Sequence, residues 1–173
     1  ADLWSVDRRY LNDKSWEKEK TYVSDNNAPS EADVEILKDK SYYRVYDASQ
    51  NPFTSAKASY FHHSIGGYHA AKLRRFQEVV EWYIAKNNME VLNMLNAKYF
   101  IQQDQQTGKM IAIPNAEACG NAWFVKEVKM MENANEEIKT LGSINPRTTA
   151  IVDKRYADQL KGFTPSFDSA NAI

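Results

Sequence analysis

The chain has 173 residues, of which 43% are hydrophobic and 12% aromatic, so it is long and apolar enough to bury a core. This composition excludes an intrinsically disordered chain. Its 22 basic and 23 acidic residues nearly cancel, and without an overall positive field we expect no nucleic-acid partner. No apolar run approaches the roughly 18 residues that a membrane-spanning helix needs.

The N-terminal part predicts a helix and a strand behind an irregular lead-in. Residues 1–28 mix polar and aromatic side chains and predict irregular structure with short extended pieces. Ser30 can cap a helix, and Asp33, three residues later, can act as its reciprocal partner, so a helix is predicted to follow. The β-rich stretch 42–48 predicts a strand, which ends at a break marked by Pro52.

The clearest helical pattern follows the adjacent glycines at 66–67. Apolar side chains recur there at the spacing of one helix face, which predicts a continuous helix over 68–85 packed on a sheet. This stripe comprises His69, Leu73, Phe76, Val79, Val80, Tyr83 and Ile84. Arg74 and Glu78 are spaced for an i,i+4 ion pair on the other side. A shorter helix is predicted over 89–95.

The pattern then changes to that of strands. Residues 97–103 and 109–114 flank a turn that contains Gly108, which predicts a β-hairpin. Residues 121–131 predict a third, bent strand. We expect residues 122–129 to join the hairpin in the sheet beneath the long helix.

The C-terminal part predicts a helix, a strand and a short helix. Asn133 can cap a helix that runs to residue 141, and Gly142 suits the position just past its end. A strand over 148–153 is followed by a short helix that Asp153 can cap.

The order of these elements lacks the regular strand–helix–strand alternation of parallel α/β folds. We therefore predict an α+β fold, in which a mixed sheet with a hairpin packs against helices. A single domain is expected over residues 1–173, with the lead-in at 1–28 and a tail at 162–173 that has no periodicity and looks truncated.

One stretch, SYFHHSIGGYHAAKLRR at 59–75, collects all three histidines and two adjacent glycines. Glycines before a helix expose backbone N–H groups at its positive end, where a phosphate or carboxylate can bind. The stretch lacks the spacing of a P-loop or a dinucleotide fingerprint, however. We interpret it mainly as a structural turn with a glycine at positive φ, Ser64 or the glycine amides at the helix start, and His69 packed against Phe76 and Leu73.

The histidines do not form a metal motif. His62 and His63 are adjacent, so in a strand they would point to opposite faces, and His69 lies on the predicted apolar stripe. The sequence has no His-Glu-x-x-His pattern. We predict no metal, no cofactor and no catalytic residue in this segment, and we expect the only cysteine, Cys119, to be a semi-buried structural residue.

Aromatic and basic side chains near the glycines offer a ligand-binding alternative to pure packing. Exposed tyrosine rings can stack on sugar rings, and basic groups can contact an anion. The candidate ligand-binding residues are Tyr60, His62, His63, Gly66, Gly67, Tyr68, Lys72 and Arg74. Convergence of these side chains on an open cleft favours ligand binding, whereas burial or pairing with carboxylates favours packing.

Three stretches together resemble the YfhO family of large bacterial membrane proteins, in the form found in Bacteroidetes-type bacteria. They are YFHHSIGGYHAAKLRRFQEVVEWYI at 60–84, VLNMLNAKYFI at 91–101, and GNAWFVKEV with TTAIVDKRYADQL within 120–160. The resemblance covers most of residues 4–162, and the SIGGYH…KLRR and LNMLN…KYFI blocks are its specific parts.

The resemblance implies a soluble extracytoplasmic, periplasmic segment cut out of a multi-pass protein of the cell membrane. In the family, this segment follows a bundle of transmembrane helices and precedes further β structure. The family is similar to the GT-C class of glycosyltransferases, which use polyprenyl-phosphate-linked sugars and place their catalytic acids in membrane-proximal loops. Those loops are outside this segment, so we expect no turnover by the isolated domain, although the parent protein resembles a glycosyltransferase.

Two hypotheses follow from the resemblance. In the first, the segment is an accessory domain that helps to bind a sugar, glycolipid or polyprenyl-phosphate substrate in cell-envelope glycan assembly. Its partners would be the membrane-embedded remainder of its own chain and that glycan or polyprenyl-phosphate sugar. In the second, it is a structural or protein-interaction domain that orders the transmembrane bundle and binds no ligand.

Overall fold

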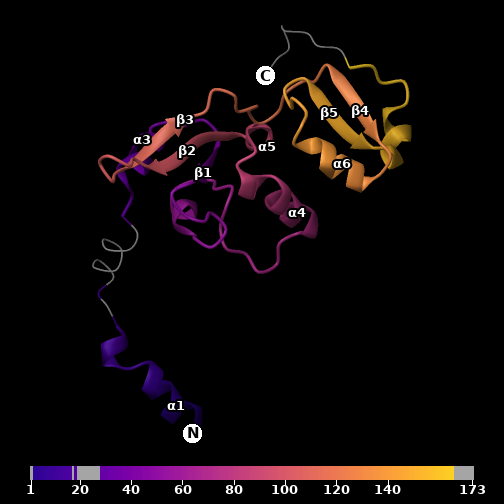
Figure 1. Cartoon of the computed structure of the whole chain (residues 1–173). Helices are drawn as coiled ribbons and strands as arrows, with labels where there is room; N and C mark the ends of the chain where they lie inside the picture. The colour runs from indigo at the N-terminus through magenta and orange to yellow at the C-terminus, as the bar shows by residue number, and fades with distance from the viewer. Residues whose placement is uncertain (1, 17, 19–27, 166–173) are drawn as a thin grey trace. The chain divides into compact units, whose positions relative to one another are not determined.

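The computed structural model describes residues 2–16, 18 and 28–165 of a chain that forms two compact units, residues 1–30 and 31–173. The described part of the second unit has the predicted α+β fold (Figure 1). Among the described residues, no helix combines the length and apolarity needed to cross a bilayer. From residue 166 onward, the predicted tail lies outside the described residues.

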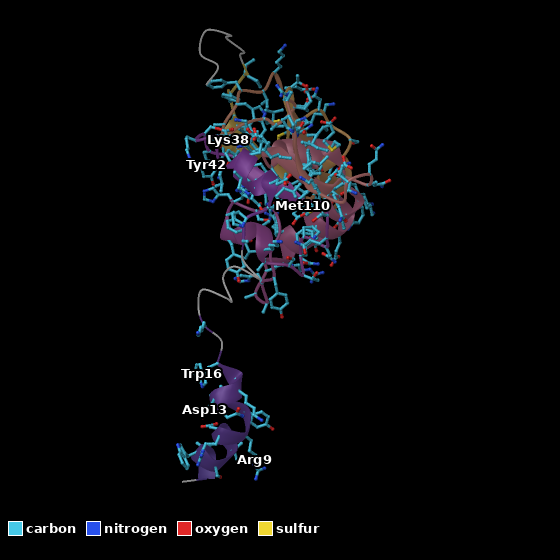
Figure 2. All side chains as sticks on the ribbon, turned by 90° about the vertical axis from the view of Figure 1, so that its left-hand side faces the viewer. Arg9, Asp13, Trp16, Lys38, Tyr42 and Met110 are labelled. Atoms are coloured by element: carbon cyan, nitrogen blue, oxygen red, sulfur yellow. The ribbon has the colours of Figure 1, made fainter. Side chains whose placement is uncertain are left out.

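The first unit contains helix α1, Asp2–Tyr10, so the prediction of an irregular lead-in is wrong for this stretch. Leu3, Val6 and Tyr10 recur at helical spacing, and two arginines in the last turn suit the negative end of the helix dipole. A 3-10 turn follows at Asp13–Ser15, and the labelled side chains of this unit project from the ribbon (Figure 2). The mixed composition concealed this local periodicity.

A three-stranded mixed sheet forms the centre of the second unit. Strand β1, Arg44–Asp47, runs parallel to β2, Ala97–Gln103, and β2 pairs antiparallel with β3, Met110–Pro114. The predicted hairpin is therefore confirmed. Its turn is closed by the Asp104 carboxylate, which accepts hydrogen bonds from the backbone N–H groups of two following residues.

Helices cover both faces of this sheet because successive strand residues point to opposite sides. Helix α3, Glu31–Ile36, begins directly after Ser30 as predicted and packs on one face with Val45 and Ile101. On the other face, Tyr46 packs with helices α4, Arg74–Trp82, and α5, Met89–Met94. The buried side chains of this second cluster include Val80, Ile84, Val91 and Leu92, and burying each contributes about 1.5–3 kcal/mol.

Helix α4 is shorter than the helix predicted over 68–85. It begins at Arg74 and ends at Trp82, and a separate 3-10 turn follows at Ile84–Lys86. Leu73 has extended backbone angles and an exposed side chain, so the N-terminal part of the predicted stripe has no core to bury against. Apolar residues at helical spacing in the sequence do not ensure that the fold supplies a surface for them to pack against.

The third predicted strand belongs to a second sheet, which corrects the expected topology. Strand β4, Glu127–Met131, pairs in parallel with β5, Thr149–Asp153, and the connection between them is helix α6, Ala134–Leu141. Residues 121–126 are not in a strand. Parallel neighbours need a crossover connection, and α6 supplies one between β4 and β5.

Two side-chain caps, one at the start of α6 and one directly after β5, match the predictions. Asn133 Oδ1 accepts hydrogen bonds from the backbone N–H groups of Asn135 and Glu136 at the start of α6. Asp153 accepts one from Arg155 N at 3.0 Å, at the start of a 3-10 helix.

Gly142, at the end of α6, is required for close packing and not for a left-handed turn. Its φ is −85°, and a Cβ at this position would lie 2.0 Å from a ring carbon of Tyr83. The Tyr83 hydroxyl donates hydrogen bonds to the carbonyls of Ile138 and Lys139. Tyr83 thus joins the end of α4 to α6.

Replacing Gly142 by alanine should force the Tyr83 ring to move and destabilise the protein by about 1–3 kcal/mol, the usual cost of overpacking. Chemical denaturation measures this change. The exposed substitution Lys139→Ala in the same helix is the control and should stay within about 0.5 kcal/mol of the parent. A Gly142→Ala variant as stable as the parent would contradict this packing role.

Candidate functional site

The eight candidate residues do not converge on one cleft. Tyr60, His62 and His63 line a pocket of about 460 Å³, within the size range of small-molecule sites. The other five, Gly66, Gly67, Tyr68, Lys72 and Arg74, do not line it. The complete lining is Leu37, Asp39, Lys40, Ser41, Tyr43, Ser59, Tyr60, Phe61, His62 and His63.

Two segments that are far apart in the sequence form the pocket. One is the turn after α3, and the other begins at the 3-10 helix Lys57–Tyr60. Val45 on β1 holds the second segment in place, because its N–H donates to His63 O at 3.0 Å and its carbonyl accepts from Ile65 N at 2.9 Å. The histidine motif is thereby fixed along the edge of β1.

His62 carries an unsatisfied nitrogen at this pocket. Its Nε2 lies 2.9 Å from Oδ1 of Asp33, a buried residue of α3, and the His62 side chain is only 1% exposed. Next to a carboxylate acceptor, Nε2 carries a hydrogen, and Nδ1 accepts or donates according to whether the ring holds one proton or two. Within the described chain, His62 Nδ1 is buried without a hydrogen-bond partner.

Asp39 supplies a fixed negative charge to the same pocket. Its carboxylate accepts from Lys98 Nζ at 2.6 Å, from Tyr99 Oη at 2.8 Å and from Ser41 N at 2.8 Å. The Lys98 hydrogen bond, followed by that of the Ser41 backbone, holds the pKa of Asp39 well below its usual range. Burial, together with the hydrogen bond to Asp39, raises the pKa of Tyr99 to about 12. At neutral pH the pair is therefore a carboxylate and a neutral phenol.

Aromatic rings form the outer part of the site. Tyr60 lines the pocket and is 65% exposed, while the His63 ring lies 5.0 Å from that of Tyr42 in a tilted arrangement. Tyr43, deeper in, donates its hydroxyl to Ile36 O at 2.9 Å. The pocket thus combines an exposed aromatic face with polar groups that donate and polar groups that accept hydrogen bonds.

The glycines have the structural role that the sequence predicts. Gly67 has a φ of +107°, as expected for one of the pair, and its N–H donates to Pro52 O at 2.6 Å. Gly66 is required for close approach, because a Cβ there would lie 2.0 Å from Pro52 O. Ser64 accepts from Gly66 N at 3.0 Å and does not cap α4, which corrects that part of the prediction.

The remaining motif residues are exposed or engaged elsewhere. His69 is exposed and accepts from Ala71 N at 3.1 Å, so its predicted packing against the helix stripe is wrong. Lys72 Nζ lies 5.0 Å from the centre of the Phe53 ring. Arg74 forms the predicted ion pair with Glu78, at 3.1 Å. These contacts do not assemble an anion-binding turn.

Sequence reasoning missed the residues after α3. Asp39, Lys40 and Ser41 lie about twenty positions before the histidine motif, and only the fold brings the two segments together. A polar run directly after a predicted helix was the one available signal.

Burial raises the pKa of the Cys119 thiol, in keeping with its predicted structural role. The described residues contain no group of three or more His, Cys, Asp or Glu that could hold a metal ion.

No protein-family model, curated protein or solved structure matches this chain. The family resemblance of the three sequence stretches therefore stays a prediction. What supports a function is the chemistry of the described residues and the geometry of their pockets.

Gly67→Val should destabilise the protein by about 1–3 kcal/mol, because valine resists a φ of +107°. His69→Ala is the matched control from the same stretch and should change stability by less than about 0.5 kcal/mol, since that side chain is exposed. Thermal melts compare the two. Equal melting temperatures for both variants would show that the turn is not under this constraint.

The Tyr99–Asp39 hydrogen bond predicts a pH dependence at the alkaline end. The folded-state pKa of Tyr99, about 12, lies above the ordinary value near 10, so its stabilising contribution is complete below about pH 10 and is lost as the pH rises toward 12. Asp39→Asn should lower the pKa of Tyr99. An NMR titration that records the ¹³Cζ chemical shift of Tyr99 as the pH rises measures this pKa. Asp104→Asn, in the hairpin turn, should leave it unchanged; an equal effect of both would argue against the pairing.

Proposed function

We propose that this chain is an extracytoplasmic accessory domain of a multi-pass, YfhO-like membrane protein and that its polar pocket binds a sugar unit. The sugar could belong to a glycan, a glycolipid or a polyprenyl-phosphate donor, since the recognising chemistry is the same. The motifs at 60–84 and 91–101 support the family part of this proposal. The pocket beside the histidines supports the binding part.

The observation that carries the proposal is the unsatisfied Nδ1 of His62. A buried polar atom without a hydrogen-bond partner costs about 1–3 kcal/mol, so a ligand group that bonds Nδ1 would gain free energy. A hydroxyl group, from a sugar directly or through a bridging water, is a suitable partner because it both donates and accepts. His62 is also one of the residues that line the pocket, which supports a ligand close to this ring.

The other pocket groups suit a polyhydroxylated ligand. Asp39 offers carboxylate oxygens, and Ser41 offers a hydroxyl that already accepts from Lys98 Nζ at 2.9 Å. The exposed ring of Tyr60 gives a face on which a sugar ring can stack. Since its pKa is lowered, Asp39 is ionised near neutral pH and its oxygens can accept hydrogen bonds from ligand hydroxyls.

Much of the motif instead favours the structural alternative, a domain that orders the transmembrane bundle without a ligand. The glycines form a tight turn against Pro52, and Arg74 is paired with Glu78. The pairing of His62 Nε2 with buried Asp33 is also a packing contact. The sugar proposal therefore rests on the pocket and not on the motif as a whole.

Two exposed tyrosines of the motif allow a matched test. Tyr60 lines the pocket, whereas Tyr68, 75% exposed, does not. We expect the purified protein to bind a sugar on a glycan array and Tyr60→Ala to weaken that binding about tenfold, or ~1.4 kcal/mol, while Tyr68→Ala leaves it unchanged. A backbone NMR titration with the bound sugar should shift residues 39–41 and 59–63. Absence of any bound sugar, or equal loss in both variants, would overturn the proposal.

A further inference from the structure

The strand–helix–strand region is an incomplete sheet. Parallel strands are usually buried in larger sheets with both faces covered, but β4 and β5 pair only with each other among the described residues. Each strand therefore has one open edge with backbone N–H and C=O groups that no neighbouring strand bonds. Open edges are the sites at which an added strand can bind.

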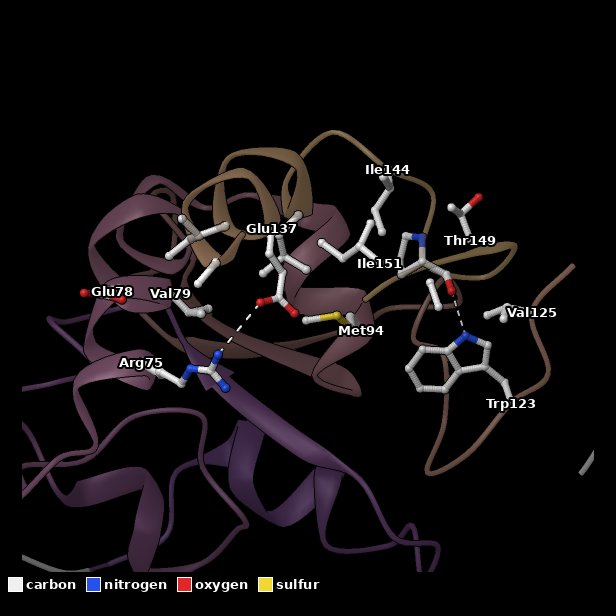
Figure 3. A pocket seen from close by; sticks show the side chains of 15 residues that line it. Arg75, Glu78, Val79, Met94, Trp123, Val125, Glu137, Ile144, Thr149 and Ile151 are labelled. Carbon is white, nitrogen blue, oxygen red and sulfur yellow. Dashed lines mark hydrogen bonds and ion pairs between the residues drawn. The ribbon is translucent and has the colours of Figure 1, made fainter. Parts of the chain in front are cut away.

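An apolar cleft of about 390 Å³ lies beside this sheet, between α4 and α6 (Figure 3). Helix α6 contributes one stripe, with residues three or four positions apart. The lining is Arg75, Glu78, Val79, Met94, Trp123, Val125, Ala134, Glu137, Ile138, Leu141, Ile144, Pro146, Thr149, Ala150 and Ile151.

The cleft runs along the open edge of β5. Three consecutive residues of this strand, 149–151, line it, and none of β4 does. A cleft that borders three consecutive residues of β5 and no residue of β4 lies on the β5 side of this two-stranded sheet. The edge concerned is the one away from β4, since β4 occupies the other.

Trp123, Arg75 and Glu78, three polar residues of the cleft, already have partners within the protein. Trp123 Nε1 donates to Pro146 O at 2.7 Å, and Arg75 lies 3.9 Å from Glu137 at the mouth (Figure 3). Glu78 is bonded to Arg74 outside the cleft. A ligand would therefore meet apolar walls and a strand edge, without a net charge to recognise.

We propose that this cleft binds an extended apolar peptide segment of a partner protein, which pairs with the β5 edge and places alternate side chains in the cleft. A lipid chain could fill the apolar space but could not bond the strand's backbone groups. A second copy of this chain is disfavoured because its own β5 edge is equally recessed between helices. The inference is independent of the sugar pocket, which shares no lining residue with this cleft.

A phage-displayed library of random peptides, selected on the purified full chain, tests the proposal. We expect enriched sequences with alternating apolar residues, whose synthetic forms shift the NMR signals of residues 149–153 and bind with little dependence on salt. Ala134→Trp, at an exposed position that lines the cleft, should weaken binding at least tenfold. Asn135→Trp, the exposed neighbour outside the cleft, is the control and should leave binding unchanged.

Backbone methylation separates strand pairing from simple groove filling. N-methylation of one set of alternate peptide amides should abolish binding, while the other set is tolerated, because only one set faces β5. Equal tolerance of both sets would overturn the pairing, and failure to enrich any peptide would overturn the site. A dimer in light scattering that Ala134→Trp dissociates would assign the cleft to a second copy and overturn the partner assignment.

Discussion

The second unit depends on one tyrosine at the end of α4. Tyr83 is buried in the main core, its ring lies against Gly142, and its hydroxyl bonds the last carbonyls of α6. Asn88 adds a side-chain hydrogen bond to Gly142 O at 3.0 Å. Through these contacts the mixed-sheet core holds the β4–α6–β5 region. The apolar cleft lies between α4 and α6, the two helices that this junction joins.

The two pockets of this unit differ in how their polar groups are satisfied. In the apolar cleft, the indole of Trp123 and the guanidinium of Arg75 already have partners, and no other described strand pairs with β5 apart from β4. In the polar pocket, Asp39 accepts three hydrogen bonds, whereas His62 Nδ1 has no hydrogen-bond partner among the described residues. Leaving a buried polar atom without a hydrogen-bond partner costs free energy. A ligand that bonds such an atom therefore gains binding free energy.

Sequence reasoning succeeded where the signal was local. The hairpin, the Asn133 cap and the positive φ at the glycine pair follow from short-range chemistry. It failed where the outcome depended on a distant surface. The apolar stripe before Arg74 has no core to pack against, and His69 is exposed for the same reason. The sequence indicated Gly142 as the end of a helix. Its contact with the Tyr83 ring, which leaves no room for a Cβ, explains why a glycine is needed there.

The sequence by itself determined the α+β class, most of the strands and helices, and the glycine turn, because hydrophobic period, capping residues and backbone freedom act within a few residues. Only the tertiary structure decided that β4 pairs with β5 rather than with the hairpin. It alone also brought Asp39 to the histidines and placed residues 149–151 of β5 along a cleft. These outcomes depend on which surfaces meet across long stretches of chain, and a single sequence has no local signal for such contacts.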